Sequence, residues 1–294
     1  MIDDPLYNYY PVKPKTADIA DFANPVRWCI KMIEAKDTLI LKSYPKCINN
    51  RNHRRLLNRK TTEAQKRIND RNVRERFSLL LIMNFSSEDL FVTLTFAKDP
   101  VDKSKVLEKL KYFLKKLRKY SLGEIKYIGV IESITVAGDQ VRSHIHLIIS
   151  GTDYGMIKEN WKYGLVDIED PKDELNIAGY LCKAFEHTPE GEHHYTRSRN
   201  LEEPVVEIKT LDERNASDFD ELEAIEKYPE AYIEEYLPDY ELSSEPEIRT
   251  SNFMPGHYVR LEMCRKNCER NFAELRKKLY FLHMANQFLG LSCN

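Results

Sequence analysis

The sequence has no apolar run long enough to cross a membrane. Its longest candidate, Leu79–Met83, is five residues long, whereas a membrane-spanning helix needs about 20 apolar residues. None of the ten glycines is followed by lysine, so the P-loop of nucleotide-driven helicases is missing. The first residues, MIDDPLYNYY, are acidic and aromatic without a basic region, which predicts no signal peptide and a cytoplasmic location.

The cysteines lack the spacing of redox or zinc motifs. Six cysteines occur in 294 residues, and none forms a Cys-x-x-Cys pair. This pattern favours free thiols in a reducing compartment over disulfides. Hydrophobic residues make up 42% of the chain and aromatic residues 11%, which is enough for one large domain or a domain with extensions.

The net charge of −2 conceals three strongly charged blocks. Residues 51–78 hold ten Lys or Arg against three Asp or Glu, a net of +7, and residues 101–120 hold eight against two, a net of +6. Residues 201–249 hold 17 acidic against four basic residues, a net of −13. The basic blocks suit a polyphosphate partner such as DNA. In the first block we assign DNA contacts to Arg54, Arg55 and Arg59.

Hydrophobic periodicity predicts an α+β fold with a central antiparallel sheet and flanking helices. The hairpin at the centre of the pattern is antiparallel by construction. The predicted helices are 51–85, 102–120, 155–162 and 174–186, and the predicted strands are 90–96, 126–135, 143–150 and 164–168.

The stretch SHIHLIIS, residues 143–150, is a predicted strand with two imidazoles. Side chains alternate between the faces of a strand, so His144 and His146 lie on one face, about 7 Å apart. A polar pair on a solvated sheet face would look the same. If the preceding hairpin loop is residues 137–139, Glu132 falls opposite His144, whereas a two-residue loop would turn Glu132 away. Two imidazoles and a carboxylate suit Mn²⁺ or Mg²⁺ with open positions for phosphate oxygens.

A tyrosine and a lysine share one face of the predicted helix 174–186. Tyr180 and Lys183 are three residues apart, and residues at i and i+3 are neighbours on a helix surface. The phenol and the ammonium can therefore address the same phosphate. A surface pair without function has the same spacing, so the pair gains weight from its position after the histidines.

In this order the motifs resemble those of HUH endonucleases of the rolling-circle replication-initiator type. The strand FVTLTF is followed by His144-Ile145-His146 and then by Tyr180-x-x-Lys183. The segments WKYGLVDIED and YTRSRNLEEP are similar to those of phage and plasmid replication-associated proteins. The resemblance covers roughly residues 50–204.

The resemblance implies a metal-dependent enzyme that nicks and joins single-stranded origin DNA, with or without a hairpin. A divalent ion held by Glu132, His144 and His146 would polarise the scissile phosphate. Tyr180 would form a 5′-phosphotyrosine link and release a 3′-OH, and Lys183 would neutralise charge or assist the phenol. A host helicase and polymerase are the implied partners, and no membrane is involved.

One departure from the family pattern bears on the reaction. Many relatives carry a second tyrosine and lysine one turn earlier, where this chain has Asn176 and Gly179. A single-tyrosine enzyme is therefore the favoured interpretation. A single-tyrosine transposase has the same motif order, and a sequence-specific DNA-binding protein without catalysis is the alternative from another class.

The expected organisation has four parts. Residues 1–85 form a basic helical extension and residues 86–204 form the endonuclease domain. Residues 205–250 form an acidic linker or insert, and residues 251–294 form a helical C-terminal segment.

Overall fold

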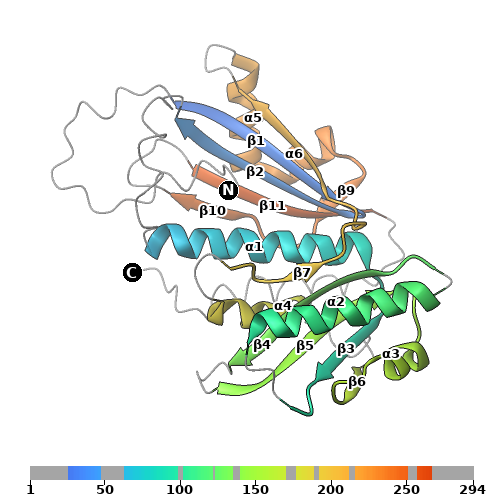
Figure 1. Ribbon diagram of the computed structural model, residues 1–294. Coiled ribbons are helices and arrows are strands. Elements are labelled where there is room, and N and C mark those ends of the chain that lie inside the picture. Colours follow the sequence, from blue (N-terminus) through green and yellow to red (C-terminus); the bar gives the residue numbers. More distant parts are fainter. Residues whose placement is uncertain are drawn as a thin grey trace. The chain divides into compact units, whose positions relative to one another are not determined.

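The chain folds into two compact units, each built on an antiparallel sheet (Figure 1). The first unit combines residues before Val73 with residues after Glu203, and the second is Val73–Glu203. Among the described residues, no helix is long and apolar enough to cross a bilayer. The computed structural model describes residues 26–47, 63–98, 102–121, 123–134, 140–169, 177–188, 192–211, 216–250 and 257–266.

The second unit contains a five-stranded sheet in the order β6-β3-β5-β4-β7. All of its neighbouring strands are antiparallel. The predicted α+β class with a central antiparallel sheet is therefore confirmed. The strands are β3 (Leu90–Thr95), β4 (Lys126–Ile134), β5 (Gln140–Ser150), β6 (Val166–Glu169) and β7 (Thr196–Arg197).

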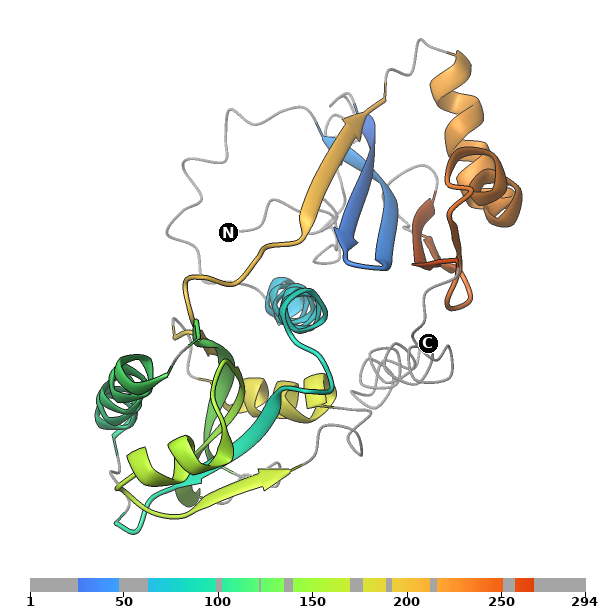
Figure 2. The same cartoon turned by 90° about the vertical axis from the view of Figure 1, so that its right-hand side faces the viewer.

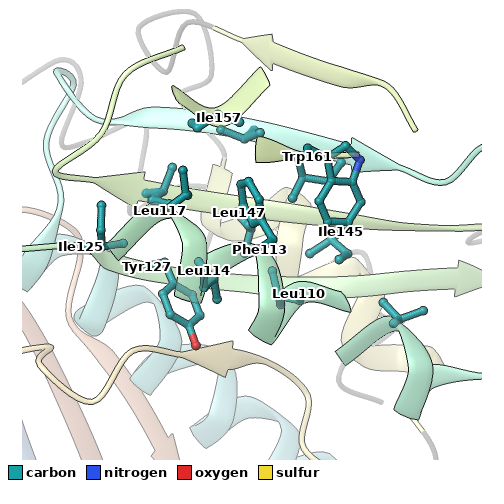
Figure 3. Close-up of a cluster of buried hydrophobic side chains, with 14 of the residues drawn as sticks. Leu110, Phe113, Leu114, Leu117, Ile125, Tyr127, Ile145, Leu147, Ile157 and Trp161 are labelled. Atoms are coloured by element: carbon teal, nitrogen blue, oxygen red, sulfur yellow. The ribbon is translucent and has the colours of Figure 1, made fainter. Parts of the chain in front are cut away.

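One face of this sheet is covered by α2 (Lys103–Tyr120) and α3 (Tyr154–Asn160). The Asp102 carboxylate accepts a hydrogen bond from the Ser104 amide and caps α2, as is usual for aspartate at a helix start. Figure 3 shows the apolar side of α2 against Ile145 and Leu147 of β5. The buried residues of α2 recur at helical spacing: Val106, Leu110, Phe113, Leu114 and Leu117.

The opposite face of the same sheet is covered by α1 (Glu63–Asn84), from Phe77 onward, and by α4 (Ile177–Lys183). A 3-10 helix, Ala184–His187, continues α4. These helices bury Phe91 of β3 together with apolar residues of β4 and β5. The second core is completed by Leu80, Leu81, Phe85, Ile128, Val130, Ile148, Leu181, Cys182, Phe185 and Leu201.

The first unit contains a six-stranded sheet in the order β10-β11-β2-β1-β8, with β9 also paired to β11. Helices α5 (Ala216–Lys227) and α6 (Pro229–Tyr236) pack on it through Ile225, Tyr232 and Ile233. The strands are β1 (Val26–Ala35), β2 (Thr38–Cys47), β8 (Val205–Thr210), β9 (Tyr240–Leu242), β10 (Glu247–Thr250) and β11 (His257–Arg265).

The structure differs from the predicted helical N-terminal extension. Residues 26–47 form the hairpin of β1 and β2, which turns at Lys36 with a positive φ of 51°. Both faces of these strands carry buried side chains, among them Ile30 and Ile33. The apolar positions therefore lack the alternation that marks a half-buried strand. Helix α1 lies within the predicted range 51–85.

The structure also differs from the predicted acidic linker and the helical C-terminal segment. Residues 205–250 are folded, because the acidic side chains lie mainly on the outer faces of α5 and α6 while Ile225 and Ile233 enter the core. The high charge of this segment favoured a linker, although charge on one helix face is compatible with burial of the other. Residues 257–265 form strand β11, and the chain after residue 266 lies outside the described residues.

Candidate metal centre and nucleophile

Strand pairing brings three potential metal ligands to one face of the sheet. Glu132 of β4 lies directly opposite His144 of β5, as predicted. The predicted loop 137–139 is wrong in detail. A register shift between Glu132 and Ile134 leaves Ile134 paired with Gln140, as a β-bulge does. The residues between Ile134 and Gln140 lie outside the described part of the chain.

The three side chains converge on a common point. The Glu132 Oε2 atom lies 3.1 Å from His144 Nε2 and 3.2 Å from His146 Nε2. All three ligand atoms lie within 4.8 Å of one another. Among the residues that the structure describes, no other three His, Cys, Asp or Glu side chains converge in this way.

The other ring nitrogens fix the orientation of the imidazoles. His144 Nδ1 lies 2.9 Å from the Arg142 carbonyl oxygen, which can only accept, so Nδ1 carries the proton. His146 Nδ1 lies 2.9 Å from the hydroxyl of Thr93, which is opposite it on β3. A neutral His144 then points its Nε2 lone pair at the Glu132 carboxylate. Two acceptors this close need a proton or a cation between them, so the donor set fits a divalent metal ion.

The centre lies at the edge of the second core. His146 is only 4% exposed and stacks on Phe91, with ring centroids 6.1 Å apart. The side chains of His144 and Glu132 are partly exposed. One side of the centre is therefore shielded from water while the other side is open to a ligand.

Helix α4 places Tyr180 beside the histidines. The Tyr180 ring lies 5.3 Å from the His146 ring and 6.3 Å from the Phe91 ring, edge-on to each. Tyr180 is 41% exposed, so its side chain is accessible. The Lys183 ammonium lies 6.0 Å from the centre of the Tyr180 ring. The structure thus brings Tyr180 and Lys183 to the same face of the sheet as the three potential ligands.

The inner side of α4 anchors this arrangement. Leu181 and Cys182 are buried in the second core, at 0% and 3% exposure. Burial raises the pKa of the Cys182 thiol to about 12, and the charge of Arg74 opposes that rise. Cys182 is therefore a neutral packing residue at physiological pH.

The other nearby tyrosines are placed differently. Tyr195 packs against Phe77 and Phe185, and burial raises the pKa of its phenol. Tyr163 packs against Phe96 and Trp161, which belong to the core on the α2 side of the sheet.

The predicted DNA-binding arginines cannot be placed. Arg54, Arg55 and Arg59 lie outside the residues that the structure describes. The second basic block forms α2, whose lysines lie on the face of the sheet opposite the metal centre.

Sequence reasoning missed two residues next to the site. Thr93 bonds His146, and its alternation with Val92 and Leu94 in the strand FVTLTF could have revealed it. Arg142 provides the carbonyl that orients His144, and its guanidinium donates to the Phe96 carbonyl at 3.4 Å. Arg142 precedes His144 by two residues on the same face of β5, so this cation was also predictable from strand alternation.

A comparison with protein families places this site within a known segment. Residues 89–189 match the model of a family described as Replication-associated protein ORF2. The matched segment holds β3, β4, β5 and α4, and with them Glu132, His144, His146, Tyr180 and Lys183. Searches of curated proteins and of solved structures gave no match. The family match supports a replication-associated protein.

Proposed function

We propose that the protein is a metal-dependent nuclease that nicks and rejoins single-stranded DNA to initiate rolling-circle replication. The observation that carries the proposal is the position of Tyr180, whose ring lies 5.3 Å from His146 of the Glu132–His144–His146 group. A nucleophile that is adjacent to a divalent site suits phosphoryl transfer by direct displacement. The match to a replication-associated family supports the biological setting.

The metal would be held by Glu132 Oε2 and the Nε2 atoms of His144 and His146. Mn²⁺ and Mg²⁺ are the proposed ions, since carboxylate and imidazole ligands with open positions suit them. Such an ion supplies Lewis-acid polarisation of a phosphate oxygen. Thr93 and the Arg142 carbonyl hold the two rings so that their Nε2 atoms face the carboxylate.

In the proposed reaction the Tyr180 oxygen attacks the scissile phosphorus. A bond forms between the phenolic oxygen and phosphorus, and the bond from phosphorus to the 3′ oxygen breaks. The phenolic proton leaves, the 3′ oxygen is protonated, and the products are a 5′-phosphotyrosine and a free 3′-OH. The ordinary pKa of a phenol is about 10, so a nearby cation such as Lys183 favours the attacking oxyanion. The reverse reaction rejoins the strand.

The arrangement also provides a path for the nucleic-acid backbone. Arg142 and Lys183 add positive charge on the face of the metal centre. Arginine and lysine bind phosphate oxygens by charge-assisted hydrogen bonds. We assign these two side chains to the phosphates flanking the scissile bond.

Cleavage of single-stranded DNA by the full chain tests the proposal. With Mn²⁺ and a randomised, end-labelled single-stranded oligonucleotide library, we expect discrete nicked products that disappear in excess chelator. His144→Ala and His146→Ala should each abolish nicking, whereas His193→Ala, at an exposed histidine outside the site, should retain it. DNA binding without any nicking in the wild type would favour the non-catalytic DNA-binding alternative.

A further inference from the structure

We infer that the chain forms a homodimer by antiparallel pairing of β8 with β8 of a second copy. Strand β8 is the last strand of the first unit's sheet and pairs with β1 alone among the described strands (Figure 2). A sheet edge presents unpaired backbone groups and is a template for another strand. This inference concerns the first unit and does not depend on nuclease activity.

Strand β8 is exposed along its whole length, on both faces. All six residues, Val205–Thr210, are exposed. Three of them are large apolar residues: Val205 is 55% exposed, Val206 is 51% exposed and Ile208 is 57% exposed. An open edge with apolar side chains is unfavourable in water and is usually shielded or paired.

The hydrogen-bond parity of β8 determines which backbone groups point outward. The Leu211 amide donates to the Trp28 carbonyl, and these residues are opposed when the register of β8 with β1 is continued by one pair. Backbone groups of successive residues in an antiparallel strand point alternately to its two sides. Residues 205, 207, 209 and 211 therefore bond to β1, whereas the N–H and C=O groups of Val206, Ile208 and Thr210 point to the open edge.

A pairing that is centred on Ile208 satisfies these outward groups. Ile208 then opposes Ile208 of the partner subunit, and Val206 opposes Thr210 of the partner subunit. All three outward-facing residues fall at hydrogen-bonded positions, which gives about six backbone hydrogen bonds across the two-fold axis. The apolar side chains of Val206 and Ile208 lie on one face of this ribbon and cover one another.

Charge complementarity favours a second copy as the occupant. In the same register Glu207 opposes Lys209 of the partner subunit, twice by symmetry. Opposite charges at directly opposed positions stabilise a strand pair, and non-hydrogen-bonded positions bring the side chains closest. Lys209 also contacts Asp218 and Glu221 of α5, yet its side chain stays 51% exposed and is accessible to a partner. A parallel pairing in register would instead oppose like charges.

Analytical ultracentrifugation of the full chain over a range of concentrations tests the inference. We expect a reversible dimer, with slow hydrogen exchange of the Ile208 amide only in the dimer. Ile208→Pro removes an outward N–H that does not bond to β1, and proline is tolerated on such an edge. This variant should be monomeric with an unchanged circular dichroism spectrum.

A charge variant provides an independent readout. Glu207→Lys should raise the dimer dissociation constant about tenfold, because two attractive pairs become repulsive. Glu230→Lys, an equal charge change on the exposed surface of α6, should leave the constant unchanged. A wild type that is monomeric at every concentration, a protected Ile208 amide in the monomer, or a dimer that persists in Ile208→Pro would overturn the inference.

Discussion

Thr93 is the residue that holds His146 in position for metal binding. Its hydroxyl lies 2.9 Å from His146 Nδ1, on the ring side away from Glu132. Thr93→Val keeps the shape of the side chain but removes this partner. Loss of such a supporting hydrogen bond typically weakens metal affinity about 10–100-fold. We expect this loss in a calorimetric Mn²⁺ titration.

Thr93→Ser is the matched control, since it keeps the hydroxyl and should bind Mn²⁺ within a few-fold of the wild type. Equal affinity of Thr93→Val and the wild type would mean that Thr93 does not orient His146.

Single residues of the site were predictable where strand alternation determines them. The shared face of His144 and His146 follows from a period of two, and the pairing of Glu132 with His144 follows from one choice of loop length. The actual connection contains a register shift that no turn rule predicts from this sequence. The correct pairing was therefore reached with the wrong loop, because the bulge compensates for the longer connection.

Helix α2 is the element with the strongest positive charge. It carries eight Lys or Arg and one acidic residue over Lys103–Tyr120. Under the proposed function, charge reversal at the exposed Lys105, Lys111 and Lys115 should weaken single-stranded DNA binding and flatten its dependence on salt, because fewer counterions are released. Fluorescence anisotropy at a series of salt concentrations measures both effects.

Replacing the same three lysines by arginine is the control, because it preserves charge and should preserve the salt slope. An unchanged slope after charge reversal would leave α2 as a solvated helix. The corresponding reversal of Arg54, Arg55 and Arg59 tests the first basic block in the same assay.

Elements of the second unit were largely predictable, and those of the first were not. Helix α2 and strands β3 and β5 have clear periods and match their predicted ranges closely. In contrast, β1 and β2 are buried on both faces, so their apolar pattern has no period that distinguishes strand from helix. The sheet order of the first unit joins β1 and β2 to β8 and β11, which lie far away in the sequence. Local patterns contain no information on such pairings.

The stability of the whole molecule should depend on pH through Cys182. Its pKa is raised to about 12 by burial, from an ordinary value of 9.0. Between these values the unfolded chain releases a proton that the folded chain retains, so stability is complete below about pH 9 and falls as pH rises. One such group lowers the unfolding free energy by up to about 1.4 kcal/mol per pH unit.

Urea unfolding at roughly pH 8, 9 and 10 measures this dependence. Cys182→Ala should lower stability at every pH because it leaves a cavity, yet it should reduce the fall with pH. A variant with the same slope as the wild type would show that Cys182 does not retain its proton in the folded state.

The central claim concerns the chemistry of Tyr180, and mapping of a covalent protein–DNA adduct tests it most directly. The full chain, incubated with Mn²⁺ and a randomised single-stranded oligonucleotide library, should form an adduct that resists denaturant. Mass spectrometry of its peptides should place the nucleotide on Tyr180, and Tyr180→Phe should bind Mn²⁺ normally but form no adduct. A nucleotide on Tyr163 or Tyr195, or an adduct that persists in Tyr180→Phe, would contradict the account.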